Sequence, residues 1–200
     1  MWREACACLF LFLEVKIMEI NVYVSSLGAY NAGELTGQWT KLPVASVKED
    51  IIDKINGAVG DEYFISDYEA PFKIGEDDSL ENLNKLAKAL NEENVGSLED
   101  LYWKLREGIG TDDTVTQYTR YDDDSDLDQM LAGETPTQII NDLGPKFNLS
   151  DSYLYWENGY LNTATEQEFQ ADLKFMATDL INSFIDKYNS TYEDSISFIN

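Results

Sequence analysis

Alternating hydrophobic and polar positions predict three strands and one short helix in the first third of the chain. Residues 19–25 alternate and are rich in β-branched side chains, which favours a strand. Further strands are expected over residues 37–42 and 62–68. Between them, residues 43–56 begin with proline and carry apolar side chains at helical spacing, so a helix is expected there. The pattern therefore predicts a β-β-α-β unit.

Apolar residues at helical spacing follow this unit. Ser79 is expected to cap one helix and Ser97 to open another, because each precedes leucines that fall on one face. Residues 108–126 break the periodicity with glycine, threonine and aspartate, and are expected to form an acidic linker. Two short helices are expected beyond it, over residues 127–132 and 136–143.

Turn and capping signals predict a hairpin and a helix in the last part of the chain. Residues 152–156 and 160–162 flank an Asn-Gly pair, which favours a hairpin. Thr165 begins a capping box for one long helix whose buried face extends to Tyr188. The residues after this helix are expected to be a loose tail or a terminal strand.

Together these elements predict an elongated α+β protein built from two or more small domains in a row. The expected parts are an extra N-terminal segment or, as the less favoured alternative, a signal (1–17), an N-terminal α+β domain (18–78), a helical segment (79–107), the acidic linker (108–126) and a C-terminal α+β module (127–200).

The N-terminal segment has the length of a secretion signal but not its flanks. Residues 5–13 are apolar and too short to span a bilayer; Arg3 is cancelled by Glu4, and no small-residue cleavage site follows. We therefore expect residues 1–17 to be extra translated sequence before a natural start at Met18. Both cysteines lie in this segment two residues apart, a poor spacing for a disulfide, so a cytoplasmic location is expected.

The charge balance excludes several classes of function. The chain has 38 acidic residues, 14 basic residues and no histidine, for a net charge of −24, while 44% of its residues are hydrophobic. That apolar fraction predicts a folded core, and the acidity opposes direct binding to nucleic acid or to an anionic membrane. The absence of histidine excludes Ser-His and Cys-His catalysis and zinc sites that contain histidine.

The acids are concentrated in two stretches. Residues 61–81 contain eight acids and one base, Lys73, and residues 107–142 contain ten acids and one base, Arg120. The candidate partner-binding surface consists of Asp61, Glu62, Asp67, Glu69, Glu76, Asp77, Asp78, Glu81, Asp112, Asp113, Asp122, Asp123, Asp124, Asp126 and Asp128.

Three interpretations of these acids compete. Residues 122–128 have the alternating aspartates of a calcium loop, but Leu127 and Gly133 occupy the positions that need glycine and glutamate, so no metal site is expected. Paired carboxylates could serve catalysis, yet no phosphate-binding loop or dinucleotide motif accompanies them, so neither an enzyme nor a cofactor is expected. The third interpretation is a surface that takes the place of a phosphate backbone. Twenty-four charges match roughly 40 Å of duplex, or about twelve base pairs, although acidity also keeps proteins soluble.

Two motifs bear on this choice. Residues 27–39 read LGAYNAGELTGQW directly after a predicted strand, and residues 62–72 read EYFISDYEAPF, followed by SLENLN at residues 79–84. In this order they resemble the N-terminal signature of the ArdA-type antirestriction proteins. The resemblance covers about residues 19–107, and the C-terminal half is not matched to the family.

The resemblance implies a DNA mimic, encoded on mobile elements or phages, that occupies the DNA groove of a Type I restriction–modification enzyme. Family members are elongated and usually dimeric, and their acidic surface as a whole is the functional element. Glu62, Asp67 and Glu69 fall inside the matching motif. The alternatives left open are an acidic adaptor for a basic protein unrelated to restriction and a divalent-cation-binding protein.

The other motif residues are expected to serve the fold. Large aromatic side chains drive burial, so these are expected to pack rather than to contact a partner: Tyr30, Trp39, Tyr63, Tyr68 and Phe72. The motif glycines Gly28, Gly33 and Gly37 are expected to serve backbone turns.

Overall fold

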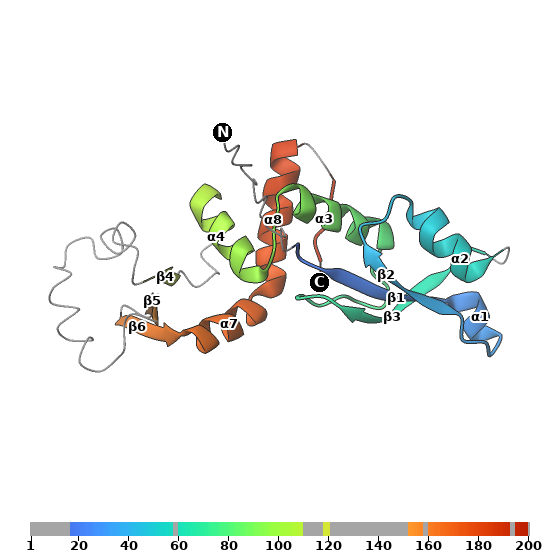
Figure 1. Cartoon of the computed structure of the whole chain (residues 1–200), viewed down its shortest axis with the longest axis horizontal. Helices are drawn as coiled ribbons and strands as arrows, with labels where there is room; N and C mark the ends of the chain where they lie inside the picture. The colour runs from blue at the N-terminus through green and yellow to red at the C-terminus, as the bar shows by residue number, and fades with distance from the viewer. Residues whose placement is uncertain are drawn as a thin grey trace, which may run out of the picture.

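The computed structural model describes residues 17–57, 60–109, 118–120, 152–157, 160–192 and 195–199. These residues form an α+β fold, as the sequence predicts. The described elements are arranged along the long axis of the molecule, with a three-stranded antiparallel sheet toward each end and helices between the sheets (Figure 1).

The N-terminal sheet confirms the three predicted strands, each within one residue of its expected bounds. β1 (Ile20–Ser26) lies in the centre, between β2 (Gly37–Leu42) and β3 (Tyr63–Glu69), and both pairings are antiparallel. The apolar residues of β1 alternate as predicted and are fully buried on one face of the sheet. The same alternation leaves the opposite face of β1 with polar and aromatic side chains.

The predicted helix over residues 43–56 begins later than expected. Its first turns are π-helical, η1 (Lys48–Ile52), and continue as α2 (Asp53–Asn56). The side-chain oxygen of Ser46 accepts a hydrogen bond from the backbone N–H of Glu49 at 3.2 Å, so this serine provides the start signal assigned to proline.

The loop after β1 contains a short helix that the hydrophobic pattern does not reveal. α1 (Leu27–Asn31) begins where Ser26 accepts a hydrogen bond from the N–H of Ala29 at 3.2 Å. It ends before Gly33, whose φ of +83° is the left-handed conformation expected for this turn glycine. A helix of about one turn is too short to display periodicity.

The two helices predicted from serine caps are both confirmed. α3 (Leu80–Glu92) is capped by Ser79, and α4 (Leu98–Ile109) begins after Ser97, whose hydroxyl accepts a backbone N–H at 3.1 Å. The leucines of both helices are buried. α2 and α3 lie on the same face of the N-terminal sheet (Figure 1).

The second sheet contains the predicted hairpin and one strand that was expected to be linker. β5 (Ser152–Glu157) pairs with β6 (Tyr160–Thr165), which confirms the hairpin. β4 (Tyr118–Arg120) pairs with β5 on its other side, although these residues fall in the segment predicted as the acidic linker. Tyr118 is fully buried, and burial is the main cause that raises its pKa.

The prediction of one long final helix is wrong. α7 (Glu166–Phe175) and α8 (Ala177–Tyr192) are separated at Met176, whose ψ of 5° is not helical. The capping box of Thr165 and Glu168 at the start of α7 is confirmed. The two helices run in different directions (Figure 1), so α7 packs beside the second sheet while α8 packs against α4. Both helices contact α4, and the break at Met176 changes the direction of the chain between them.

The C-terminal segment forms neither the loose tail nor the terminal strand that the sequence predicts, as far as residues 195–199 describe it. Residues 195–199 have no regular structure, but they are hydrogen-bonded to helices through asparagine side chains. Asn82, Asn182 and Asn189 each donate from the amide nitrogen to a backbone carbonyl and accept the N–H of the same residue, at 2.7–3.0 Å. Ile196 and Ile199 are buried between these anchors.

The buried side chains form one continuous cluster that includes residues of both sheets. At its C-terminal end, the Phe169 ring lies within 6 Å, centroid to centroid, of four other aromatic rings, those of Tyr102, Trp103, Tyr118 and Tyr153. Burial here raises the pKa of Tyr102 to about 12. The predicted domain boundaries stay predictions.

Several expectations fall outside the described residues. They concern most of the N-terminal segment and the short helices expected over residues 127–132 and 136–143. Among the helices that are described, none has the length and apolar character needed to cross a bilayer.

Gly37 provides a test of the packing in the N-terminal sheet, because it lies in β2 rather than in the expected turn. A Cβ atom at this position would lie 2.7 Å from Cε1 of Tyr23 and 2.8 Å from the carbonyl oxygen of Val24. Gly37→Ala is expected to lower the free energy of unfolding by roughly 1–3 kcal/mol, the usual cost of overpacking. Urea unfolding followed by circular dichroism measures this change. Thr36→Ala, at the exposed neighbouring position, is the control, and equal stability of the two variants would contradict the close approach.

Candidate functional site

Eight predicted site residues lie on β3 and on the segments that flank it at this side of the sheet, and we call this surface the β3 acidic edge. It consists of Asp61, Glu62, Asp67, Glu69, Glu76, Asp77, Asp78 and Glu81. The chain leaves β3, turns back and runs beside it, because the N–H of Ile65 donates to the carbonyl of Glu76 at 2.9 Å. The hydroxyl of Tyr63 accepts the N–H of Leu80 at 3.1 Å, which holds the start of α3 at the same place. Acids from three consecutive segments are therefore brought together.

A β-bulge determines which way two of these acids face. Ile65 pairs with Val24 and Asp67 pairs with Tyr23, so Ser66 is an extra residue in β3. Because side chains alternate with a period of two, Ile65 and Asp67 would share the buried face without the bulge. The bulge turns Asp67 and Glu69 to the outer face of the sheet, where both are exposed.

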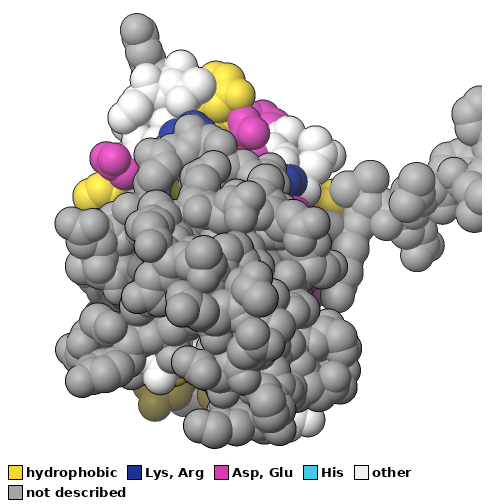
Figure 2. Space-filling view, turned by 90° about the vertical axis from the view of Figure 1, so that its left-hand side faces the viewer, with side chains coloured by type: hydrophobic (Ala, Val, Ile, Leu, Met, Phe, Trp, Pro, Cys, Tyr) yellow, Lys and Arg dark blue, Asp and Glu magenta, His cyan; other side chains and the backbone are white. Residues whose placement is uncertain are grey.

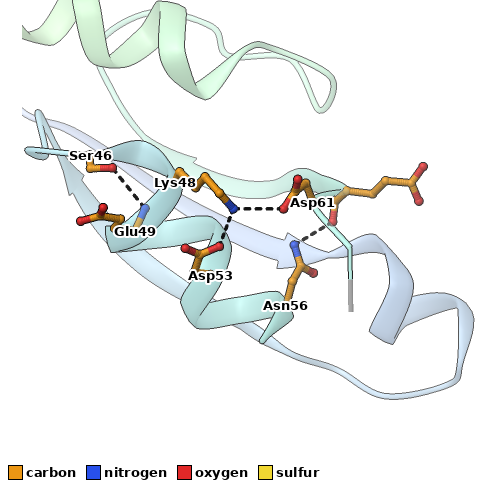
Figure 3. A network of polar contacts seen from close by, with 7 residues as sticks. Ser46, Lys48, Glu49, Asp53, Asn56 and Asp61 are labelled. Atoms are coloured by element: carbon orange, nitrogen blue, oxygen red, sulfur yellow. Dashed lines mark hydrogen bonds and ion pairs between the residues drawn. The ribbon is translucent and has the colours of Figure 1, made fainter. Parts of the chain in front are cut away.

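One base reaches the acidic edge from the helix beside it. Lys48 Nζ lies 2.7 Å from an Asp53 carboxylate oxygen and 3.3 Å from one of Asp61 (Figure 3). These hydrogen bonds raise the pKa of Lys48, and the bond to Asp53 makes the largest contribution, so the lysine stays charged. Asp61 is thereby partly neutralised, whereas Asn56 binds the backbone carbonyl of Glu62 rather than its carboxylate.

Most of the other acids on this edge keep their charge uncompensated. In the described part of the chain, four of these side chains form neither a hydrogen bond nor an ion pair: Glu62, Glu76, Asp77 and Glu81. Among the described residues, Asp67 accepts only the N–H of Tyr68, at 2.8 Å, and Glu69 accepts only from the amide of Asn21, at 3.3 Å. These neutral donors hold the carboxylates in place without cancelling their charge.

Asp78 differs from its neighbours because its carboxylate supports the loop. It is half-buried, and its Oδ2 atom accepts the N–H of Gly75 at 2.7 Å. The N–H of Asp78 donates in turn to the carbonyl of Gly75 at 3.2 Å, which closes the turn. Asp78 is therefore a structural member of the edge.

At the other end of the molecule, three carboxylates of α7 are engaged in the fold. Tyr118 and Tyr153 donate their hydroxyls to acids of α7, and Glu168 caps the same helix. The Thr165 N–H lowers the pKa of the Glu168 carboxyl. In Figure 2, which views this end, the described residues that are visible show acidic, basic and hydrophobic side chains side by side. Among the acids of this end that the structure describes, Asp172, Glu166 and Glu168 thus have structural partners.

The second predicted acid cluster lies outside the described residues. Its members are Asp112, Asp113, Asp122, Asp123, Asp124, Asp126 and Asp128. A continuous stripe from one cluster to the other therefore stays a prediction, and so does the calcium hypothesis for residues 122–128. Within the residues that are described, no group of three potential ligands is placed to hold a metal ion.

The prediction that the motif aromatics pack holds for only part of the set. Phe72 is buried, and Tyr63 and Tyr68 pack against the core. Trp39 and Tyr30, by contrast, are 48% and 56% exposed. Trp39 is exposed because it lies opposite Tyr23, on the polar face of β1. This position can be recognised only once the strand register is known.

Fold and surface together define an acidic α+β protein with an edge of uncompensated carboxylates at the surface of its N-terminal sheet. The profile of the family described as antirestriction protein (ArdA) matches residues 22–198, and the chain belongs to this family. The match corrects the expected limit near residue 107, because the C-terminal half is also part of the family pattern. No curated protein matches the chain.

A matched pair of variants separates structural from surface acids. Asp78→Ala is expected to lower the free energy of unfolding by roughly 0.5–2 kcal/mol, because it removes a side-chain acceptor that closes a turn. Asp77→Ala removes the same charge one residue away and is expected to change stability by less than about 0.5 kcal/mol. Thermal or urea unfolding of both variants measures the difference. If Asp77→Ala were as destabilising as Asp78→Ala, the assignment of roles would be wrong.

Proposed function

We propose that this antirestriction protein acts as a DNA mimic that occupies the DNA-binding groove of a Type I restriction–modification enzyme. The observation that supports this most directly is the β3 acidic edge, with its exposed carboxylates and few compensating bases. A groove that binds DNA presents lysine and arginine to phosphates. Carboxylates held on a rigid strand and helix start offer the same charge to those side chains.

The mechanism is an equilibrium competition and involves no chemical step or cofactor. The inhibitor and DNA bind the same cationic groove, so occupancy by one excludes the other. Long-range attraction steers the acidic protein toward the groove as it steers DNA. Because the attraction is between charges on the surface, salt screens it, and inhibition is expected to weaken as ionic strength rises.

The arrangement of the fold suits this role. The described elements are spread along the long axis of the molecule (Figure 1), which lets a chain of modest length extend along a groove. The exposed acids of the edge come from a strand, a loop and the first turn of a helix, all held by backbone hydrogen bonds. Such an edge is pre-organised, so little conformational entropy is lost when it binds.

Displacement of DNA tests the proposed function. A purified Type I methyltransferase is bound to a fluorescent duplex that carries its recognition site, and the protein is added while anisotropy is measured. At low salt the protein is expected to displace the duplex. Its affinity is expected to fall about tenfold or more between about 50 and about 200 mM NaCl. No displacement at low salt would refute the mimic.

Variants that neutralise acids test whether the β3 acidic edge is the surface that binds the enzyme. Glu76→Gln with Asp77→Asn neutralises two exposed acids whose side chains form no hydrogen bond or ion pair in the described part of the chain, and is expected to weaken inhibition roughly tenfold. Asp179→Asn with Asp186→Asn makes the same charge change on exposed positions of α8 and is expected to have a much smaller effect. Inhibition constants from the displacement assay measure both. Equal losses would show that net charge, not the β3 acidic edge, determines binding.

A further inference from the structure

The outer face of the N-terminal sheet carries aromatic rings beside its acids. β-strand register places Trp39, Tyr23 and Asp67 in one row across the three strands. The Tyr23 and Trp39 rings meet edge to face with centroids 5.6 Å apart. Tyr23 is able to lie across β2 because Gly37 has no side chain in its path. Two adjacent rings are therefore fixed in position on this face.

This aromatic row is open in the part of the chain that is described. The helices α2 and α3 lie on the opposite face (Figure 1), and the outer-face residues of β2 and β3 are largely exposed. Trp39 is 48% exposed although it belongs to a folded strand. Exposed tryptophan and tyrosine on a rigid support are typical of the residues that contribute most to protein interfaces.

The acids beside the rings determine which partner this face can accept. Asp67 lies next to Tyr23 and about 10 Å from Trp39 across the sheet, and Glu69 follows on the same face. Aromatic sheet faces can stack the bases of single-stranded nucleic acid, but here the phosphates would meet these carboxylates. A second copy of the chain would bring the same negative charges. An arginine, in contrast, stacks on an aromatic ring and pairs with a carboxylate at the same time.

We propose that the Trp39–Tyr23 pair with Asp67 receives an arginine-bearing segment of the protein partner. The guanidinium stacks on the rings, and Asp67 accepts its hydrogen bonds. This inference rests on the proposed function, since the restriction enzyme's groove supplies the cation. The rings add a short-range contribution to affinity that involves no charge on this protein, so this part of the binding is screened less by salt than the attraction between the acids and the groove.

Variants at Trp39 test the inference in the displacement assay. Trp39→Leu keeps the hydrophobic bulk but removes the ring, and it is expected to weaken binding roughly three- to thirty-fold. The loss is expected to be similar at low and at moderate salt, because no charge is removed. Trp39→Tyr keeps a ring and is expected to retain most of the affinity. Phe175→Leu, at a residue 90% exposed on α7, is the control for loss of a surface ring and is expected to have no effect.

A double-mutant cycle tests whether ring and carboxylate bind the same side chain. Trp39→Leu combined with Asp67→Asn is expected to cost clearly less than the sum of the two single losses. Circular dichroism and melting of each variant control for folding, and Trp39→Tyr provides a second variant if Trp39→Leu is unstable.

The outcomes separate this inference from the proposed function. If the wild type fails to displace DNA, both fail. If the wild type displaces DNA and Trp39→Leu does so equally well, only this inference is overturned. Binding of a labelled oligothymidylate that requires Trp39 would assign the face to single-stranded nucleic acid and overturn it. A change from dimer to monomer in Trp39→Leu, seen by sedimentation, would assign the face to self-association and also overturn it.

Discussion

Repulsion among carboxylates is the constraint on which this structure depends. A net charge of −24 on 200 residues opposes compaction, and too few bases are present to neutralise it. The five ion pairs seen among the described residues are all at the surface and contribute little to stability. The fold is instead held by the apolar cluster that includes residues of both sheets and by neutral hydrogen-bond donors.

Tyrosine and asparagine side chains provide many of those donors. Tyrosine hydroxyls bind carboxylates of α7 and of the end of α3, and asparagine amides bind the C-terminal segment and the loop after β2 through paired hydrogen bonds. A hydroxyl donor stabilises a carboxylate without removing its charge. The protein therefore obtains structural contacts from its acids and keeps the negative surface that the proposed function needs.

Local patterns were enough to predict much of the fold. The alternation of β1, the serine caps of α3 and α4 and the capping box of α7 each depend on a few neighbouring residues, and all are present. The break between α7 and α8 and the anchored C-terminal segment depend on contacts between distant residues, such as Asn82 with Ser197. No periodicity within either segment carries that information.

The candidate site was predictable in composition but not in orientation. Acid density identified the residues around β3, yet the bulge at Ser66 that turns Asp67 outward has no sequence signature of its own. β2 has polar residues on both sides of its alternation, so nothing in its sequence decided that Trp39 would be exposed. Strand register, which pairs both residues with Tyr23, is the missing information.

The central claim is that carboxylates of the β3 acidic edge take the place of DNA phosphates. A structure of the complex with a Type I methyltransferase, determined by electron cryo-microscopy, tests it most directly. The account predicts that Glu62, Glu76, Asp77 and Glu81 face the lysines and arginines that contact phosphates in the DNA-bound enzyme. A complex in which this edge faces solvent, or in which the DNA groove stays empty, would contradict the claim.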